Sequence, residues 1–544
     1  MLFNSPEFLF WFLPITVAGF FVFGHFRLER IAVAWLVFAS LFFYAWWRLD
    51  YLVILAGSIV FNYAIGRRLI ERPSGLLLGV GVGANLLVLG YFKYSLFLAD
   101  NVNWMFGTSF SIGAMLLPLG ISFFTFQQIA YLIDCKSGIT TEKNLLNYSL
   151  FVSFFPQLIA GPIVHHKEML PQFKERSTFK PNLENIVLGL SIFGIGLFKK
   201  VVIADRIAVH ATEAFNAALA GATLTFVEAW AAALTFTLQL YFDFSGYSDM
   251  AIGLALIFGV RIPINFNSPF KAVSVIEFWQ RWHMTLTRFL TMYLYNPIVM
   301  TLTRRRLAAG KPLLQRKSTS FGPFVVLLVF PTMFTMFWAG VWHGAGYQYL
   351  IFGVLHGSYI VINHAWRLLR RSFDFVGPTT ARVMRPFGVL LTFCAVVVSL
   401  VFFRAETVPQ AISVLEGMAG LNGVYIPAQW QRLLGPVNAI LPSWIEFAWI
   451  HYVRTSQVGV LGLLMLVVWF CPNTQDWIAG NVGAGRSTGI FARAKQFAVK
   501  FQPGRILYGW SPSPTAAVWV GLLISLSILE IVSEAPSEFL YFNF

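Results

Sequence analysis

Long apolar segments recur along the whole chain and constrain its fold more than any other feature. A membrane-spanning helix needs about 20 predominantly apolar residues. Candidate segments lie near 8–23, 31–47, 51–65, 76–97, 110–132, 147–163, 184–204, 223–240, 247–260, 322–342, 347–366, 386–403, 457–471 and 514–532. Only 12% of the 544 residues are charged, about half the share in an ordinary soluble domain. The sequence therefore predicts an all-α polytopic membrane protein with about 11–14 membrane helices, re-entrant segments included, and it excludes a soluble fold.

The distribution of lysine and arginine predicts the orientation of the chain, because cytoplasmic loops of membrane proteins carry an excess of both. No basic residue precedes the first apolar segment, whereas His25, Arg27 and Arg30 follow it. We therefore expect a retained first span with the N-terminus outside the cytoplasm. A basic stretch from Arg493 to Arg505 precedes the last span and places the C-terminal tail outside as well. Cytoplasmic loops also account for the net charge of +15, so no nucleic-acid partner is expected.

Composition divides the chain into four parts. A membrane core (1–403) is followed by a more polar, proline-containing extramembrane or interfacial loop with short helices (404–456), by C-terminal membrane helices with a cytoplasmic basic loop (457–532), and by an extracytoplasmic tail (533–544). Within the core, segment 147–163 contains FFPQLIAGPI, whose two prolines interrupt a helix. Interrupted backbone at membrane depth must be satisfied by protein or by water in a cavity. A re-entrant hairpin that lines a cavity is therefore expected here.

Two kinds of site find no support in the sequence. Cys135, Cys394 and Cys471 lie far apart and show no CxxC or Cys/His spacing, so neither disulfides nor a metal site is expected. A Walker A sequence is also lacking, so ATP hydrolysis within this chain is unsupported.

Ionisable residues within apolar segments are costly and so are default functional candidates. The first cluster, QLYFDFSGYSDMAIG, contains Asp243, Ser245 and Asp249. One interpretation is structural: the helix breaks here, Asp243 caps a new helix and Asp249 pairs with a buried base. The other is a cation or proton site.

The second cluster is NFNSPFKAVSVIEFWQRWHMTLTRFL. From Ser274 to Leu290 it predicts an aromatic, amphipathic helix, in which Glu277 and Arg281 stand one turn apart and can form an ion pair. His283 in this helix is a candidate catalytic residue. The alternative is an interfacial helix whose arginines extend to the membrane surface.

The third cluster is TMFWAGVWHGAGYQYLIFGVLHGSYIVINHAW. His343 lies within an apolar segment between Trp342 and Gly344, and nearby glycines permit close backbone approach. A buried histidine is disfavoured in its charged form, so His343 could act as a neutral base that activates a hydroxyl for attack on an acyl thioester. The alternative is a histidine that hydrogen-bonds a neighbouring helix. His356 is expected to be a packing residue.

Several motifs occur in one order that is typical of a known family. VWHGAGYQYLIFGVLHG, FWQRWHMTLTRFL, LYFDFSGYSDMAIGLAL, SFFPQLIAGPI and the opening LFNSPEFLFWFLPI resemble the membrane-bound O-acyltransferase superfamily, in the branch that contains the alginate acetylation membrane protein. The D-alanyl transferases of teichoic acid modification are more distant relatives. The resemblance runs from Leu2 to about Ala405 and implies a helical bundle around a central funnel or tunnel, where a cytoplasmic acyl donor meets an acceptor from the other side.

The resemblance also implies roles for individual residues. His343 of the WHG motif matches the catalytic position, and His283 of the RWH motif matches a second signature position that faces the same cavity. Polar or structural positions of the tunnel are assigned to Asp243, Ser245, Asp249, Glu277, Arg281 and Trp342. The ending FLYFNF is similar to a motif in which a tyrosine is a covalent acyl relay, which makes Tyr541 a candidate relay residue. The alternative for this tail is an aromatic anchor at the membrane interface.

The implied activity is O-acetylation of a cell-envelope polysaccharide or an exopolysaccharide. Acetyl-CoA would be the acyl donor, and the protein would lie in the inner membrane of a bacterium. Its partner would be an SGNH-type extracytoplasmic acetyltransferase. After FLTMYLYNP, however, this chain continues as IVMTLTRRRLAAGKP instead of with the glycine-rich loop usual in alginate-type relatives. The acceptor therefore stays open among alginate-, cellulose- and peptidoglycan-like polymers. D-alanyl or lipid acyl transfer is an alternative, as is a transporter or channel that uses His343, Asp243 and Asp249.

Overall fold

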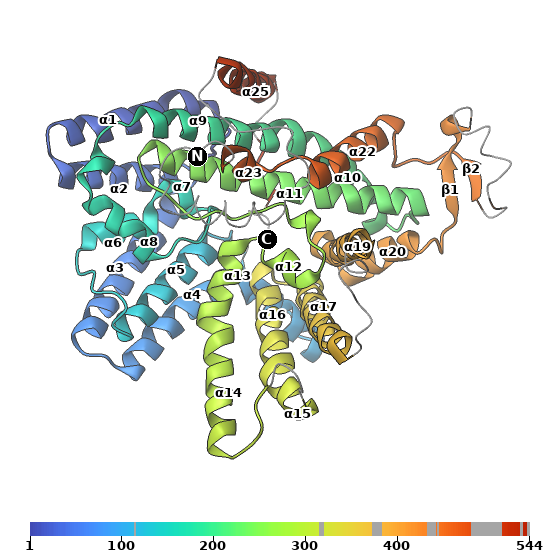
Figure 1. The fold of residues 1–544 in the computed structure, drawn as a ribbon, viewed down its shortest axis with the longest axis horizontal. Helices are drawn as coiled ribbons and strands as arrows, with labels where there is room; N and C mark the ends of the chain where they lie inside the picture. The colour runs from blue at the N-terminus through green and yellow to red at the C-terminus, as the bar shows by residue number, and fades with distance from the viewer. Residues whose placement is uncertain are drawn as a thin grey trace. The chain divides into compact units, whose positions relative to one another are not determined.

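A computed structural model describes residues 1–113, 116–314, 320–372, 383–431, 442, 445–479, 514–533 and 537–540. The chain forms two compact units, each built from separate stretches of sequence. Unit 1 comprises Met1–Val202, Asp243–Asn265 and Thr474–Phe544. Unit 2 comprises Ile203–Phe242 and Phe266–Asn473. Both units consist almost entirely of helices (Figure 1), which confirms the predicted all-α class.

Unit 1 is a bundle of apolar helices. Its elements are η1 (Phe8–Phe12), α1 (Leu13–His25), α2 (Glu29–Ala45), α3 (Leu49–Glu71), α4 (Gly75–Phe106), α5 (Ile121–Lys136), α6 (Leu145–Ser153), α7 (Phe155–Leu158), α8 (His166–Met169), η2 (Leu170–Lys174), η3 (Arg176–Phe179), α9 (Leu183–Phe198), the beginning of η4 (Lys199–Ala204), part of α11 (Phe226–Ile257), α23 (Thr474–Ala479) and α25 (Pro514–Ser533). Side chains cap several of these helices: the Ser74 hydroxyl accepts from the Leu77 amide at α4, and Asn182 accepts from Asn185 at α9.

The segment between α6 and α8 is interrupted, as the prolines of FFPQLIAGPI predict. α6 ends at Ser153, Pro156 lies in the single turn of α7, and irregular backbone leads from there to α8. Gly120, the residue before α5, has a φ of 69° and packs against this segment so closely that a Cβ would lie 2.8 Å from the Leu158 carbonyl oxygen. The broken segment is thus supported by protein backbone, while its re-entrant course in a membrane stays a prediction.

α11 is one uninterrupted helix, and Asp243, Ser245 and Asp249 lie within it. The predicted helix break with Asp243 as a cap is therefore wrong. Small residues in this stretch serve helix packing instead: a Cβ on Gly246 would lie 2.7 Å from the Gly196 carbonyl oxygen of α9. Such close backbone approach between helices is the usual role of glycine in membrane proteins.

Unit 2 contains the remaining described elements. They are α10 (Asp205–Leu219), the first part of α11, η5 (Pro269–Lys271), α12 (Val275–Trp279), α13 (Met284–Leu290), η6 (Thr291–Tyr295), α14 (Asn296–Ala308), α15 (Phe321–Phe324), η7 (Val325–Val329), α16 (Phe330–His343), α17 (Tyr347–Ser372), α19 (Arg385–Arg404), α20 (Val408–Met418), β1 (Val424–Pro427), η8 (Ala428–Trp430), β2 (Ile445–Ala448) and α22 (Thr455–Phe470). The strands β1 and β2 pair in parallel within the region predicted as a polar loop.

The predicted helix from Ser274 to Leu290 is interrupted, contrary to expectation. α12 ends at Trp279 and α13 begins at Met284, and His283 between them adopts a left-handed backbone with φ 43°. The Arg281 carbonyl accepts a hydrogen bond from the Asn267 amide (2.9 Å). That oxygen is thus engaged by a neighbouring loop at the point where the helical ladder stops.

Seven helices among the described residues are long and apolar enough to cross a membrane. They are Phe8–His25, Leu49–Glu71, Gly75–Phe106, Leu183–Leu219, Phe321–His343, Arg385–Arg404 and Pro514–Ser533. Other predicted segments form helices that are shorter, such as α2 with 17 residues and α22 with 16. The chain is a multi-pass membrane protein.

Candidate active site

His343 is the last residue of α16, and the extended backbone of Gly344 ends the helix behind it. The imidazole is 5% exposed and lies among aromatic rings. Its ring centroid is 5.0 Å from that of Trp342, 5.6 Å from that of Phe352 and 5.1 Å from that of Phe403, and all three rings are steeply inclined to it. The residue that the sequence singles out therefore has a defined, buried and largely apolar setting.

Glycines bring α16 and α17 together beside His343, and the two helices lie side by side (Figure 1). A Cβ on Gly340 would lie 2.4 Å from the Tyr349 carbonyl oxygen and 3.1 Å from Gly353 Cα. A Cβ on Gly344 would overlap the Tyr349 ring. These glycines thus allow close packing of α16 against α17, and the volume beside Gly344 is filled by a tyrosine ring.

His283 shares an aromatic neighbour with His343. Its ring centroid is 6.3 Å from that of Trp342, so the two imidazoles contact the same indole. His283 is 1% exposed and lies outside the seven candidate spans. Burial lowers the pKa of His283 to about 3, which keeps the ring neutral at physiological pH. The structure therefore brings together the two predicted catalytic histidines and Trp342.

A hydrogen-bonded ion pair supports the backbone around His283. Glu277 Oε1 accepts from Arg281 Nε (3.0 Å) and Nη2 (2.8 Å), as their spacing predicts. Glu277 Oε2 also accepts from the Val273 amide (3.0 Å), and Arg281 Nη1 donates to the Asn267 carbonyl (3.2 Å). The side chain of Arg281 is 8% exposed, so this ion pair lies largely inside the protein and stabilises the backbone there.

His356 fits its predicted role in packing. The Trp279 indole donates to Nδ1 (3.2 Å), and the Ser399 hydroxyl lies 2.8 Å from Nε2. Both ring nitrogens therefore have polar neighbours on α12 and α19, which is a structural arrangement.

In unit 1, Asp243 forms a buried ion pair with Lys200, a pairing that was not predicted from the sequence. Its Oδ1 lies 2.8 Å from Lys200 Nζ, and both side chains are at most 4% exposed. The pair also binds the C-terminal tail. Lys200 donates to the Ser537 hydroxyl and the Glu538 carbonyl, each at 3.0 Å, while the Leu540 amide donates to Asp243 Oδ2 at 3.0 Å.

The tail is also held by contacts outside this ion pair. The ring of Phe539 is 2% exposed and lies 4.6 Å from the Tyr247 ring and 5.5 Å from the Phe244 ring. The Asn4 side chain donates to the Ser537 carbonyl (3.1 Å). Tyr541, the predicted relay, lies outside the described residues, which end at Leu540.

Asp249 pairs with a base, as predicted, and the side chain of this base, Lys199, is 14% exposed. Its Oδ2 accepts from Lys199 Nζ and from the Thr474 hydroxyl, each at 2.7 Å, and its Oδ1 accepts from Gln475 Nε2 (3.1 Å). Close contact of α9 and α11 at Gly196 and Gly246 brings the lysines to the carboxylates. The pair Lys199–Lys200 directly after an apolar segment was the available signal, because buried cations require acidic partners. The hydroxyl of Ser245 has no hydrogen-bond partner among the described residues.

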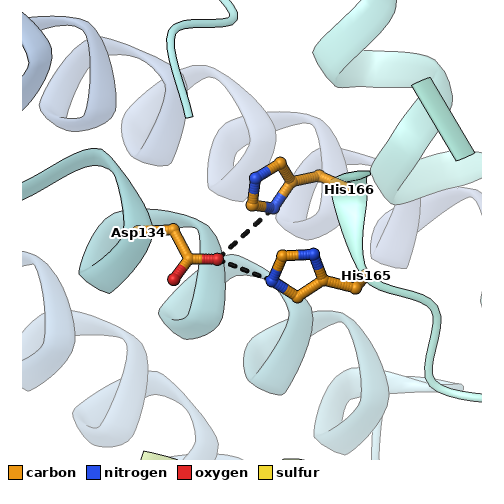
Figure 2. A group of neighbouring side chains, drawn as sticks. All are labelled: Asp134, His165 and His166. Carbon is orange, nitrogen blue, oxygen red and sulfur yellow. Dashed lines mark hydrogen bonds and ion pairs between the residues drawn. The ribbon is translucent and has the colours of Figure 1, made fainter. Parts of the chain in front are cut away.

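A further polar group, also missed, lies where α5 ends and α8 begins (Figure 2). His165 Nε2 donates to Asp134 Oδ2 (2.7 Å), and His166 Nδ1 lies 3.6 Å from the same oxygen. Burial, and to a smaller extent neighbouring His165, lowers the pKa of His166 to about 4. In the sequence, the two histidines stand out only as adjacent basic residues after an apolar segment, and nothing there indicates that Asp134 lies beside them.

Comparison with known proteins identifies related sequences along the whole chain. The profile of the membrane-bound O-acyltransferase family matches residues 136–309. A peptidoglycan O-acetyltransferase of Helicobacter pylori is 38% identical over 575 residues, which cover 100% of this chain and 98% of the relative. A probable alginate O-acetylase of Pseudomonas aeruginosa is 35% identical over 100% of both chains. A teichoic acid D-alanyltransferase of Streptococcus thermophilus is 26% identical over 52% of this chain and 68% of its own.

Proposed function

Because the chain belongs to the membrane-bound O-acyltransferase family, we propose that it is the acetyltransferase subunit of a system that O-acetylates a polysaccharide of the bacterial envelope. The donor is acetyl-CoA from the cytoplasm, and the acetyl group crosses the inner membrane to an alginate-, cellulose- or peptidoglycan-like acceptor. The observation that carries the proposal is the full-length similarity to two relatives named for O-acetylation. Membership of an acyltransferase family weighs against a transporter or channel.

His343 is the general base of the proposed reaction. It removes the proton from an acceptor hydroxyl while the hydroxyl oxygen attacks the acetyl carbonyl carbon of acetyl-CoA. The thioester C–S bond breaks, the proton passes from the imidazole to the CoA thiolate, and the acetyl group remains as an ester on the acceptor oxygen. His283 assists by orienting the site, and its support is the indole of Trp342, which both imidazoles contact. Arginines and lysines of cytoplasmic loops meet the CoA phosphates.

Tyr541 is the proposed first acceptor. Its phenol takes the acetyl group as an ester and transfers it to a serine of an SGNH-type partner outside the membrane, which acetylates the polymer. The support is the docked tail: Phe539 is buried and the Leu540 amide binds Asp243, so the chain is held in place up to the residue that precedes the tyrosine.

Acetyl transfer can be tested on the purified full-length protein in lipid vesicles with isotopically labelled acetyl-CoA. We expect release of the CoA thiol and a labelled acetyl group on the C-terminal peptide, found by mass spectrometry. The Tyr541→Phe variant keeps the ring and removes the hydroxyl, so it should lose the label.

Two outcomes would contradict parts of the proposal. If the unmodified protein shows no CoA release and no label, this result would contradict acetyl-CoA as the donor. CoA release with polymer acetylation intact in Tyr541→Phe would contradict only the relay. D-alanyl transfer, the alternative suggested by the more distant relative, would appear as an alanyl adduct on the same peptide.

A further inference from the structure

We propose that Asp134, His165 and His166 bind a divalent transition-metal ion of the Zn²⁺ class. Each of the three residues offers one ligand atom, and these atoms all lie within 4.8 Å of one another. Two imidazoles and one carboxylate form a donor set that first-row divalent ions accept. The His165 Nε2 and Asp134 Oδ2 atoms, now 2.7 Å apart, would have to separate, because two ligands of one tetrahedral Zn²⁺ ion lie about 3.3 Å apart.

The buried imidazole of His166 is the observation that points to a ligand. The residue is 3% exposed, and neither of its ring nitrogens has a hydrogen-bond partner among the described residues. Its nearest neighbours include the rings of Tyr131 and Phe151, which stand almost perpendicular to it at about 6 Å. Buried polar atoms normally have partners. A metal ion on Nδ1 would supply one at the side where Asp134 lies, 3.6 Å away.

The alternative without a metal is the hydrogen bond from His165 to Asp134. In that state Nδ1 of His165 accepts a long bond from the Lys167 amide (3.3 Å), so Nε2 carries the proton that is donated to Asp134. Metal coordination through Nε2 would move the ring proton to Nδ1 and end the contact with Lys167. This contact is weaker than a metal–ligand bond. The metal-free state leaves His166 unexplained, whereas the metal-bound state uses all three side chains.

The position of the group indicates what the ion does. Asp134 lies in the last turn of α5, and the two histidines follow the interrupted segment that ends at α8. An ion here would fix the end of the irregular backbone to a regular helix. The side chain of His165 is 16% exposed, which leaves an approach for the ion and for a water ligand. The proposed site is therefore a structural metal site within unit 1, and it is independent of the proposed acetyl transfer.

The test uses full-length protein prepared without a histidine tag, stripped with a chelator and reloaded with Zn²⁺. We expect one bound ion per chain by elemental analysis and a higher unfolding temperature after reloading. Co²⁺ should give the visible absorption bands of a site with nitrogen and oxygen ligands. The His166→Gln and Asp134→Asn variants should lose the ion, the bands and the temperature shift.

His364→Gln is the matched control, because His364 is a half-buried histidine of α17 outside the group. It should retain the ion. Metal content that is equally low in the unmodified protein and in all variants would overturn the proposal, as would Zn²⁺ retained by His166→Gln. The reloading and Co²⁺ measurements on the unmodified protein need no variant, so they decide the matter even if Asp134→Asn fails to fold.

Discussion

Unit 1 and unit 2 bury their ionisable side chains in different ways. In unit 1, Asp243 and Asp249 each lie within 2.8 Å of a lysine ammonium and accept further hydrogen bonds. In unit 2, His343 lies among three aromatic rings, and buried His283 contacts one of these, the indole of Trp342. Paired charges fix the positions of chain segments but resist changes in protonation, whereas an imidazole can gain and lose a proton during a reaction. The difference teaches that the buried carboxylates of α11 organise structure, whereas the setting of the two histidines is suited to acid–base chemistry.

Replacement of His343 should have the largest effect on activity. We expect His343→Ala to lower the rate of acetyl transfer by about 10²- to 10⁴-fold, the usual contribution of a positioned acid–base group. CoA release and polymer acetate measure the rate. His364→Ala, which removes a half-buried histidine of the same unit, should retain activity. Full activity in a well-folded His343→Ala protein would show that this residue is not catalytic. The distinction between structural carboxylates and catalytic histidines would then fail.

Breaking the buried ion pair of unit 1 should mainly affect stability. Asp243→Asn leaves the Lys200 charge buried without its acidic partner, which costs about 3–5 kcal/mol, and it weakens the bond to the Leu540 amide. Thermal unfolding and the rate at which a protease removes the tail report the two effects. The double variant Lys200→Met/Asp243→Leu should recover much of the stability while the tail stays accessible. A protected tail in the double variant would show that the remaining contacts, made by the Phe539 ring and by Asn4, are enough to hold it.

Replacement of His283 distinguishes the role of its imidazole from the role of its left-handed backbone. A left-handed backbone costs an ordinary residue about 1–2 kcal/mol but costs glycine little. His283→Gly should therefore fold well and still lose about 10- to 10²-fold in rate, because the imidazole no longer orients the site. Initial rates at saturating acetyl-CoA measure the loss. Normal rates in His283→Gly, with reduced stability in His283→Ala, would assign the residue a purely structural role.

Loss of the ion pair between Glu277 and Arg281 should have the smallest effect. Glu277→Gln removes the charge but keeps an amide oxygen as an acceptor, so we expect a loss of about 1.5 kcal/mol in the free energy of unfolding. Denaturant or thermal unfolding in detergent measures it. A loss as large as that of Asp243→Asn would contradict the distinction between the two ion pairs, since the Glu277 side chain is 17% exposed and the Asp243 side chain is 2% exposed.

Local chemistry in the sequence predicted part of this arrangement. The helical class, the ion pair of Glu277 with Arg281 and the pairing of Asp249 with a base follow from hydrophobicity, helix spacing and the cost of a buried charge. The grouping of His283 with Trp342 and His343 was expected from the resemblance to the family, not from the residues themselves.

Other features depend on contacts that no local pattern reveals. Ser245 and Gly246 suggested a break in α11, yet the close packing of Gly246 on Gly196 accommodates a continuous helix. The interruption at His283 coincides with a hydrogen bond from Asn267 to the Arg281 carbonyl, a contact between segments 14 residues apart. Such tertiary contacts override the helical propensity of the segment.

The docked tail has a consequence for how freely its sequence can change. Lys200 and Asp243 bind the carbonyl of Glu538 and the amide of Leu540, groups that every residue other than proline provides. Among the described residues of the tail, 537–540, Phe539 is the one that inserts an aromatic ring. The site therefore contacts the backbone of three residues, Ser537, Glu538 and Leu540, and the side chains of two, Ser537 and Phe539. Glu538 and Leu540 should therefore accept many replacements, whereas position 539 should accept only large aromatic residues. Related chains could then differ at 538 and 540 and still bind their tails in the same place.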